Sequence, residues 1–434
     1  MLGPIEIWRT LYRDNVAKIN VYPLDEKIEL LEINERYSRY TCNLSYLTAE
    51  FYAFMPGRSA LKLLDKTLSI KLELNSLKRI GAAVAQPYLP TCCTEVKDKN
   101  EISQSATNEL GFVEKRMQEI DASSDRETVL LKALKEGVEG TERKRTKSDQ
   151  SVIYVEVDGT GVSGLPKELS EEGKNGGCAK TFEAKIGVMF SQGFDSNGLP
   201  LLHNNHIFRD PDSTQYMGTD KKVAEFTAQL DTFTTMHSID SANQVVFISD
   251  GAPWLEKLRM KLFPNSIGII DLFHARQHLY SLVDSLCPDS EGEKIDFYMK
   301  CRHLLDLGEI EQIVNLISQK ITRSNKKDIE KQLNYFTENK NKMRYGLFRA
   351  AGLFIGSGVI ESACKILVEI RLNGPGMRWL KKNAAYIIAL RAAIYSGRYG
   401  YATPLHRAPR SGSLVSTPAL HCASYSGSCA SATA

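Results

Sequence analysis

Three acidic residues in this chain each end an apolar run with the composition of a buried strand. They are Asp158 in VIYVEVDGT, Asp250 in VVFISD and Asp271 in IGIID. Runs rich in Val and Ile predict strands buried on both faces, as in a mostly parallel sheet. Ligands of such sheets gather outside the carboxyl ends of the strands. We therefore expect the three acids to converge there and to form a cation site.

The sequence around these acids predicts an α/β fold with a mixed sheet. In Thr181–Phe190, large apolar side chains alternate with smaller or more polar ones, which is typical of a strand with one buried face and antiparallel neighbours. Helices are predicted at Lys221–Thr232 and Ala252–Phe263, ahead of the second and third acidic strands. Antiparallel strands followed by a βαβ unit give a sheet flanked by helices on both faces. Gly159–Lys180, rich in glycine and charge, is predicted to be a flexible hairpin loop.

A further acid lies in the helical part of the sequence. After Asp271 the pattern predicts helices to about Ser396, with no further strand. In GSGVIESAC, the glycines around Ser357 predict a turn, and Val359–Arg371 continues as an amphipathic helix, so Glu361 lies in its first turn. An acid at this position also has an ordinary explanation, because it complements the helix dipole by about 0.3–1 kcal/mol.

Residues 1–90 are predicted to form a helical N-terminal region. Its clearest segments are Leu47–Phe54, Ser59–Leu68 and Ser76–Ala85. Asn75 is the expected N-cap of the third segment. Three short helices with Lys78 and Arg79 early in the last one fit a helix-turn-helix that lays this helix in a DNA groove. A plain helical subdomain with a solvated basic face explains the same pattern.

Changes in composition mark the other boundaries. Residues 91–150 are dominated by Lys, Glu, Asp, Ser and Thr and predict a polar connector, with one amphipathic piece around Glu127–Gly137. Residues 401–434 are rich in Ser, Ala and Pro, which predicts a disordered tail. No apolar run reaches the roughly 18 residues that cross a bilayer, and Met1–Lys18 lacks a signal-peptide pattern, so we expect a cytosolic protein without membrane contact. The cysteines form no CxxC pair, which argues against a zinc ribbon or a disulfide framework.

The acids and their surroundings belong to five longer motifs. They are VEVDGTG, ISDGAPW, DLFHARQHL, MRYGLFRAAGLFIGSGVIES and GMRW. Together they resemble the DDE transposases of bacterial insertion sequences, in the group typified by the Kra elements. The resemblance covers about Leu44–Arg398, and the sequence ahead of Leu44 departs from the family pattern. It implies an RNase H-like catalytic domain at 151–279 and 346–400, interrupted by an all-α insertion at 280–345.

The resemblance also assigns the catalytic acids by motif. Asp158 in VDGT would bridge two Mg²⁺ ions, for which Mn²⁺ can substitute, while Asp250 in SDGA and Glu361 in SGVIES would hold one ion each. Three ionised acids repel one another in a low-dielectric cleft and therefore require cations. Two such ions about 3.5–4 Å apart can activate the attacking oxygen and stabilise the leaving oxygen of a phosphoryl displacement. The implied activity is cleavage of DNA at the element ends by water, followed by strand transfer by a DNA 3′-hydroxyl.

Asp271 and His274 form a DxxH pattern that related transposases carry near the last core strand. The resemblance implies that both residues support the catalytic centre, by positioning either DNA or the acids. Zinc binding by His274 and His278 is an alternative, but the segment lacks the glutamate of HExxH and a third ligand. Capping and packing, with Asp271 as an N-cap, also explain the pattern.

Basic residues cluster after the predicted insertion, where they could contact DNA phosphates near Glu361. With Lys78 and Arg79, the residues predicted to bind DNA are Arg344, Arg349, Lys365, Arg371, Arg378 and Trp379. Trp379 could stack on an unpaired base. Each of the basic residues also fits a solvated helix face, and the tryptophan also fits core packing.

The partners that the resemblance implies are double-stranded DNA, as element ends and as target, and further copies of the chain assembled on it. The expected location is the bacterial cytoplasm, at the nucleoid. Two other functions stay open. A related RNase H-like nuclease would cut DNA without joining it. A host-adopted DNA-binding protein derived from a transposase would bind the same ends and cut nothing.

Overall fold

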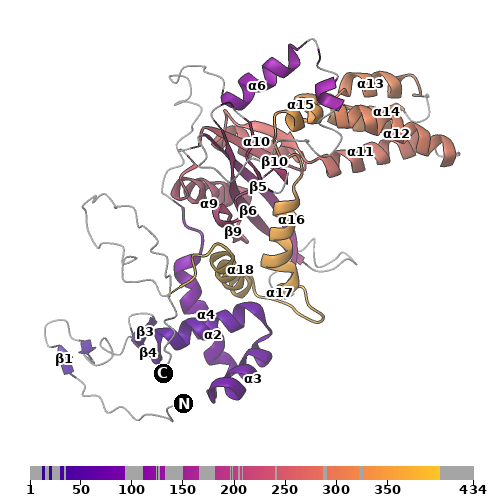
Figure 1. The fold of residues 1–434 in the computed structure, drawn as a ribbon. Coiled ribbons are helices and arrows are strands. Elements are labelled where there is room, and N and C mark those ends of the chain that lie inside the picture. Colours follow the sequence, from indigo (N-terminus) through magenta and orange to yellow (C-terminus); the bar gives the residue numbers. More distant parts are fainter. Residues whose placement is uncertain are drawn as a thin grey trace, which may run out of the picture. The chain divides into compact units, whose positions relative to one another are not determined.

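The computed structural model contains a five-stranded sheet with covering helices and a helical N-terminal region (Figure 1). No helix of the described residues is long and apolar enough to cross a membrane. The described residues are 12–14, 19–21, 30–33, 36–92, 111–123, 125, 128–131, 150–165, 181–195, 197, 199–203, 206–207, 209–239, 242–286, 291–321 and 326–400.

The five-stranded sheet has the order β11-β10-β5-β6-β9. β10 pairs in parallel with β5 and β11, whereas β6 pairs antiparallel with β5 and β9. The three apolar runs that end in acids therefore form neighbouring parallel strands, and the mixed sheet that the sequence predicts is confirmed. The strands are β5 (Gln150–Ser163), β6 (Thr181–Phe194), β9 (Gln215–Thr219), β10 (Gln244–Ser249) and β11 (Ile267–Ile270).

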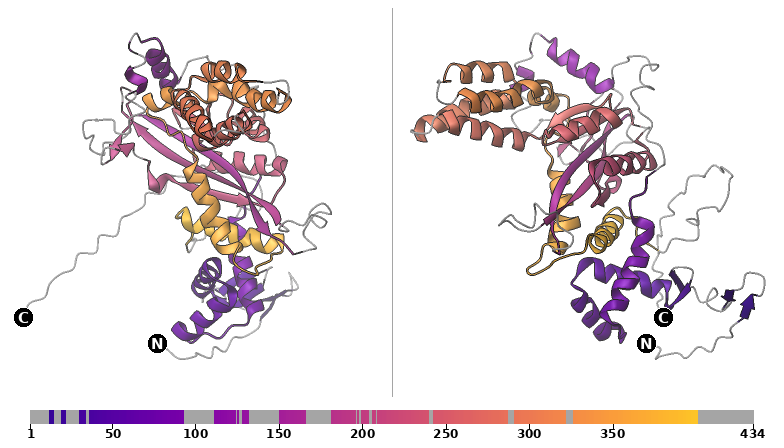
Figure 2. Two further views of the ribbon diagram at one scale, coloured as in Figure 1. Left: turned by 90° about the vertical axis from the view of Figure 1, so that its right-hand side faces the viewer. Right: turned by 180° about the vertical axis from the view of Figure 1, so that it is seen from behind.

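Helices cover both faces of this sheet (Figure 2). On one face, Val155 shares an apolar cluster with Phe226 of α9 and Leu255 of α10. On the other, Tyr154 belongs to a cluster with Leu272, at the start of α11. Because Tyr154 and Val155 are adjacent in β5, the alternation of side chains along the strand separates the two clusters. The first two helices are α9 (Val223–Met236) and α10 (Pro253–Leu262).

A helical segment that carries Glu361 packs on the second face of the sheet. It begins as α16 (Gly358–Cys364), continues as a π-helix at Lys365–Glu369 and ends as α17 (Ile370–Leu372). Ile360 and Leu367 of this segment share an apolar cluster with Ile186 of β6 and with Ile388 of α18 (Lys381–Tyr395). Short π-helical stretches inside helices occur often at functional sites.

The N-terminal part contains three helices, as the sequence predicts, preceded by two short strand pairs. Asn75 lies inside the third helix, which begins at Leu74, so its predicted role as N-cap is wrong. Ile80 and Leu390 of α18 share an apolar cluster, which joins these helices to the C-terminal one. The elements are β1 (Tyr12–Asp14), β2 (Ile19–Val21), β3 (Leu30–Ile33), β4 (Arg36–Thr41), α2 (Cys42–Phe54), α3 (Gly57–Leu68) and α4 (Leu74–Ala85).

The segment between β11 and α16 contains helices and no strand among its described residues. α11 starts directly after Asp271 and runs past residue 280, where the sequence places the start of the insertion. Leu279, Cys301, Ile313 and Phe336 belong to one buried cluster that holds these helices together. The helices are α11 (Leu272–Leu286), α12 (Glu291–Leu307), α13 (Ile310–Ser318), α14 (Lys326–Asn339) and α15 (Tyr345–Ala350).

Three further details differ from the sequence-based expectations or extend them. The hairpin loop predicted from Gly159 is too long, because β5 continues to Ser163 as a partner of β6. The edge strand β9 is not predicted by the pattern, and the connector contains α6 (Phe112–Asp121). Two short strands, β7 (Leu202–His203) and β8 (His206–Ile207), pair with each other. The predicted tail at 401–434 lies outside the described residues.

Candidate active site

Asp158 is half-buried where β5 leaves the apolar core. Its Oδ1 accepts a hydrogen bond of 2.6 Å from the backbone N–H of Gly159. Burial raises the pKa of the carboxyl group, and the negative charges of Asp250 and Glu361 raise it further, against the lowering effects of the Gly159 N–H and of His274. The three predicted metal ligands therefore lie close enough for their charges to interact.

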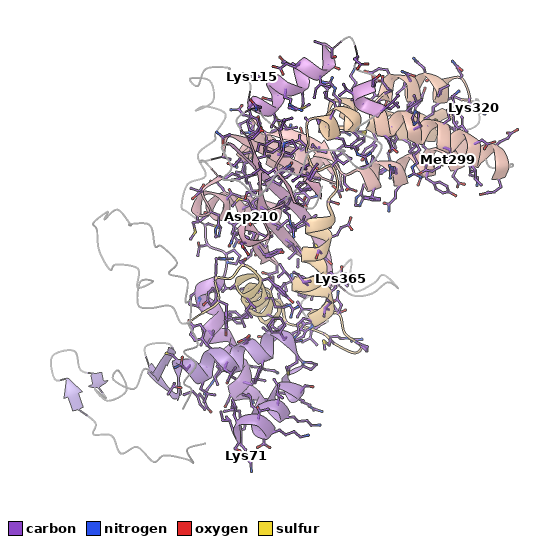
Figure 3. The ribbon with its side chains drawn as sticks, in the orientation of Figure 1. Lys71, Lys115, Asp210, Met299, Lys320 and Lys365 are labelled. Carbon is purple, nitrogen blue, oxygen red and sulfur yellow. The ribbon has the colours of Figure 1, made fainter. Side chains whose placement is uncertain are left out.

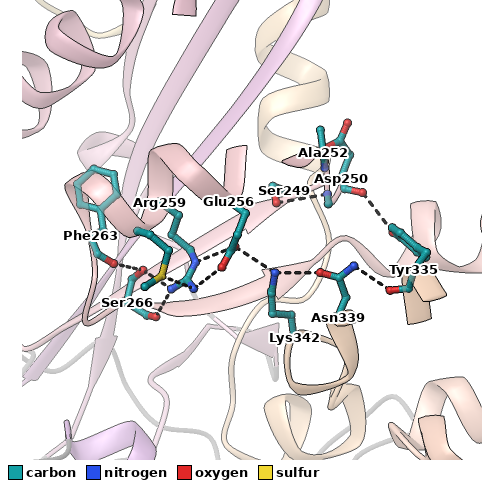
Figure 4. Close-up of polar contacts among 12 residues, drawn as sticks. Ser249, Asp250, Ala252, Glu256, Arg259, Phe263, Ser266, Tyr335, Asn339 and Lys342 are labelled. Carbon is teal, nitrogen blue, oxygen red and sulfur yellow. Dashed lines mark hydrogen bonds and ion pairs between the residues drawn. The ribbon is translucent and has the colours of Figure 1, made fainter. Parts of the chain in front are cut away.

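Asp250 follows the last residue of β10, and its side chain shapes the turn into α10. Its Oδ1 accepts a hydrogen bond of 2.8 Å from the N–H of Ala252, just before the helix begins at Pro253. Its main-chain carbonyl accepts a hydrogen bond of 3.2 Å from the hydroxyl of Tyr335 in α14 (Figure 4). The second acid is thus fixed by its own loop and by α14.

Further polar contacts extend this link to α10 (Figure 4). Asn339 donates to the carbonyl of Tyr335, and Lys342 donates to Oδ1 of Asn339. The ammonium of Lys342 also lies 3.1 Å from Glu256, which pairs with Arg259 as well. Burial would raise the pKa of Glu256, but these two cations outweigh it and lower the pKa. The chain of contacts holds α14 and Lys342 against α10 and the loop that carries Asp250.

Glu361 lies in the first turn of α16, as the sequence predicts, and its side chain is exposed. Its Oε1 accepts a hydrogen bond of 3.2 Å from the hydroxyl of Ser357. An open cleft of about 530 Å³ runs beside it, lined among others by Asp158, Thr160 and Lys365. Asp250 does not line this cleft, although its charge acts on Asp158.

Asp271, His274 and Glu361 form the one group of three or more potential metal ligands found among the described residues. One ligand atom of each lies within 4.8 Å of the others. Asp271 is fully buried, and its Oδ2 accepts hydrogen bonds from the backbone N–H of His274, at 2.8 Å, and from the ring Nδ1, at 3.0 Å. Its Oδ1 accepts a third from the N–H of Ser357, at 2.7 Å. Both oxygens of Asp271 are thus engaged by the protein.

These contacts have opposite effects on the two partners. Burial would raise the pKa of Asp271, but the hydrogen bonds from His274 and Ser357 outweigh it and lower the pKa. The hydrogen bond to Asp271 raises the pKa of His274, against burial, and the charges of Asp250 and Glu361 add to the rise. Asp271 therefore caps α11 and orients His274 at once, two roles that the sequence analysis treats as alternatives.

The structure does not bring the histidine pair of the zinc alternative into one ligand group. His278 packs its ring against Tyr335, with ring centroids 4.2 Å apart. Within the described ranges, it is not a member of the group that contains His274. Burial lowers the pKa of His278, and the nearby His274 lowers it further.

Glu156 belongs to the site, although the sequence analysis does not single it out. It lies two residues before Asp158, is completely buried, and its Oε2 accepts a hydrogen bond of 2.8 Å from the N–H of Ile360. Its Oε1 has no hydrogen-bond partner among the described residues. Burial raises the pKa of Glu156 to about 8, and the charge of Asp271 contributes. The sequence does contain a signal for its position, because alternation along a strand places Glu156 and Asp158 on the same face of the sheet.

Some of the residues predicted to bind DNA are exposed, and others are half-buried or paired with other residues of the protein. Lys365 is exposed on the rim of the cleft (Figure 3). Lys78, Arg79 and Arg378 are also exposed. Arg344 pairs with Asp121 of α6 at 2.5 Å and is half-buried, as is Arg349 in α15.

Arg371 does not fit the predicted role in DNA binding. It is only 2% exposed, and its guanidinium donates two hydrogen bonds to the carbonyl of Tyr52. It also lies over the rings of Tyr52 and Trp379, 5.6 and 5.1 Å from their centroids. The indole of Trp379 is half-buried and donates to the carbonyl of Leu372. Both side chains thus fix the end of α17 against α2, as core packing predicts.

Comparison with known proteins adds no family to this geometry. No protein-family model matches the sequence, and no match to a curated protein is found. The function therefore has to be argued from the acids and from the elements that hold them.

Proposed function

We propose that the protein is a metal-dependent DNA transposase that uses Asp158, Asp250 and Glu361 to cut element ends and to join them to target DNA. The observation that carries this proposal is that Asp158 of β5 and Glu361 of α16 line one open cleft, while Asp250, directly after β10, lies near enough for its charge to act on Asp158. Their spacing in the sequence is large, so only the fold brings them together. Such a concentration of carboxylates serves phosphoryl transfer when cations neutralise it.

The elements that carry the three acids also support this proposal. A mixed sheet and a following helix carry the three acids, and helices separate the second acid from the third. This arrangement supports an RNase H-like catalytic domain with a helical insertion, which the motif resemblance implies. The contact of Tyr335 with Asp250 gives the insertion a structural role beside the acids.

The ligand chemistry of the site suits Mg²⁺. Carboxylate oxygens dominate, and the negative charges of Asp158, Asp250 and Glu361 exceed the positive charges of His274 and Lys365. Hard cations prefer such oxygen ligands. When bound, two such ions would activate an attacking oxygen and stabilise the leaving oxygen of an in-line displacement.

The other residues of the site would orient these acids and the DNA. Asp271 fixes the ring of His274, whose second nitrogen is left for the acids or for a phosphate oxygen. Lys365 stands at the cleft and would contact a backbone phosphate. The substrate is double-stranded DNA, and paired ends require at least two copies of the chain.

A cleavage assay tests the proposal directly. The substrate is a duplex that carries the inverted repeats flanking the coding sequence, incubated with the full chain and Mg²⁺. Asp158→Asn, Asp250→Asn and Glu361→Gln should each abolish cleavage, because each removes an anionic ligand. Asp296→Asn is the matched control, since Asp296 is exposed on α12 and far along the chain from the acids.

The products separate the proposal from its alternatives. Joining of a cut 3′ end to a second DNA supports a transposase, and cleavage without joining supports a nuclease. Binding of the ends without any cleavage would point to a DNA-binding protein. If all three acid variants cleave as well as the natural chain, the site is wrong.

A further inference from the structure

A second hollow shares part of α16 with the acid cleft, and nothing in the proposed chemistry uses it. Its volume is about 440 Å³, and its lining residues come from β6, β9, residue 209, the segment before α16 and α16 itself. Gly358 and Ser362 line both this hollow and the acid cleft. A ligand in the second hollow would therefore lie next to a substrate strand bound in the acid cleft. We call it the aromatic pocket, after Phe190, Tyr216 and Phe354 in its wall.

The aromatic wall is held firmly by the core. Phe190 stacks on the buried ring of Tyr154, with centroids 4.9 Å apart, and meets Phe354 edge-on at 6.1 Å. The backbone of Phe354 is also fixed, because its N–H donates a hydrogen bond of 3.2 Å to the hydroxyl of Tyr154. The backbone of Tyr216 is fixed by the hydroxyl of Ser396 at 2.9 Å. Tyr216 and Phe354 are half-buried, so part of each ring is open to a ligand.

Arg209 brings a positive charge into this wall. Its guanidinium lies 5.6 Å from the ring centroid of Phe190. Within the described part of the chain, no hydrogen bond or ion pair engages that guanidinium. Burial raises the pKa of Tyr216, and the charge of Arg209, which lines the same pocket, opposes this rise. An unpaired guanidinium among aromatic rings suits a ligand that is planar and carries acceptor atoms.

A nucleobase with its phosphate has this chemistry. Each of the DNA bases can stack on aromatic side chains, and Arg can bind either the acceptor edge of a base or a phosphate. The volume lies within the roughly 300–1,000 Å³ of sites for small ligands. Near the start of α16, Asp271 and Glu156 engage the backbone N–H groups of Ser357 and Ile360, and Arg209 is the positively charged side chain of the lining that would hold an anion.

We propose that the aromatic pocket receives one unpaired base of the DNA that lies in the acid cleft, with Arg209 binding its acceptor edge or its phosphate. Identifying the ligand as DNA rests on the proposed function. Extruding a base from the duplex costs a few kcal/mol, which stacking in such a pocket offsets. The pocket would thereby fix the register of the strand relative to Asp158 and Glu361.

The test compares the affinity of the full chain for two duplexes in the presence of EDTA, by fluorescence anisotropy. One duplex carries the element end fully paired, and the other carries the same sequence with one unpaired adenine near the expected cut. The natural chain should bind the second duplex about fivefold more tightly or better. Arg209→Gln should lose this preference and keep its affinity for the paired duplex. Arg302→Gln on α12, which lines neither hollow, is the matched control and should keep the preference.

The pocket proposal is overturned if the natural chain shows no preference, or if Arg209→Gln retains it. Tyr216→Leu, which removes the ring but keeps apolar volume, gives a second variant and should also weaken the preference. Binding of free deoxyadenosine monophosphate is measured as well. If it binds in an Arg209-dependent manner while the duplexes do not differ, the occupant is a free nucleotide and the DNA base is excluded. Because the measurement needs no metal, a preference without Mg²⁺-dependent cleavage would refute the proposed function and leave the pocket standing.

Discussion

Oδ1 of Asp271 accepts a hydrogen bond of 2.7 Å from the backbone N–H of Ser357, across 86 positions of the sequence. This contact ties the end of β11 to the residue before the helix that carries Glu361. Glu156 makes a similar contact from β5, to the N–H of Ile360. Two buried acidic side chains thus hold the first turn of α16, and the position of Glu361 over the sheet follows from them.

Replacing Asp271 should therefore cost stability as well as activity. Asp271→Ala leaves the buried N–H of Ser357 without a partner and frees the ring of His274. We expect the free energy of unfolding to fall by about 1–3 kcal/mol, as for a buried polar group that loses its partner. Asp250→Ala is the comparison, because the carboxylate of Asp250 is half-exposed and bonds only within its own turn. Urea unfolding of both variants measures the difference, and equal stability would contradict the role given to Asp271.

The sequence indicates the strands and the first turn of α16 because local pattern determines them. The apolar runs before Asp158 and Asp250 are long enough to need burial on both faces, which only a covered sheet provides. Glycines around Ser357 mark the helix start, so the position of Glu361 in the first turn also follows. The alternation of side chains along a strand also predicts that Glu156 lies on the same face as Asp158.

Other features depend on contacts between distant segments. The strand β9, with the sequence QYMGT, is short, contains a glycine and has polar positions, so its pairing with β6 and its packing on α18 decide its structure. Arg371 looks like a solvated charge, but its flanking Leu367, Val368 and Leu372 place it on the buried face of the helix. The contact of Tyr335 with Asp250 joins two segments that share no local pattern.

Crowding of the acids predicts a specific response to Mg²⁺. The charges of Asp250 and Glu361 raise the pKa of Asp158, beyond the rise that burial causes, so the metal-free site is held under repulsion. Without divalent cations, Asp250→Asn should unfold at a higher temperature than the natural chain. With saturating Mg²⁺ the order should reverse, because a ligand at about 100 times its Kd contributes about 2.7 kcal/mol. Thermal unfolding with and without Mg²⁺ measures both effects, and an identical response of the two proteins would show that Asp250 holds no cation.

Glu156 predicts a pH dependence of stability with a definite sign. Burial raises its pKa from 4.5 to about 8, so the folded chain keeps a proton that the unfolded chain has lost between these values. The stabilisation is complete below pH 4.5 and is lost as the pH rises through about 8. The free energy of unfolding should fall by up to about 1.4 kcal/mol per pH unit in this window from this group alone.

Glu156→Gln isolates that contribution, since the amide oxygen can still accept from Ile360 and does not titrate. The variant should show a flatter stability curve than the natural chain between pH 5 and about 8. Glu338→Gln, at an exposed position of α14, should follow the natural curve. Parallel curves for the natural chain and Glu156→Gln would mean that Glu156 is ionised in the folded state.

Arg371 and Lys365 lie on one helical segment and should respond oppositely to loss of charge. Arg371→Gln removes two buried hydrogen bonds to Tyr52 and should lower the free energy of unfolding by about 1.5–3 kcal/mol. Lys365→Gln, at an exposed position on the cleft, should leave stability within about 0.5 kcal/mol.

DNA binding measured over a range of salt concentrations completes this comparison. If Lys365 contacts a phosphate, its loss should reduce the slope of log K against log salt by about one, while Arg371→Gln keeps the natural slope. Binding is measured at a temperature where both variants are folded, so that stability does not enter the slope. A reduced slope in Arg371→Gln with full stability would restore Arg371 to the DNA-binding surface, because a guanidinium that contacts a phosphate has to leave the carbonyl of Tyr52.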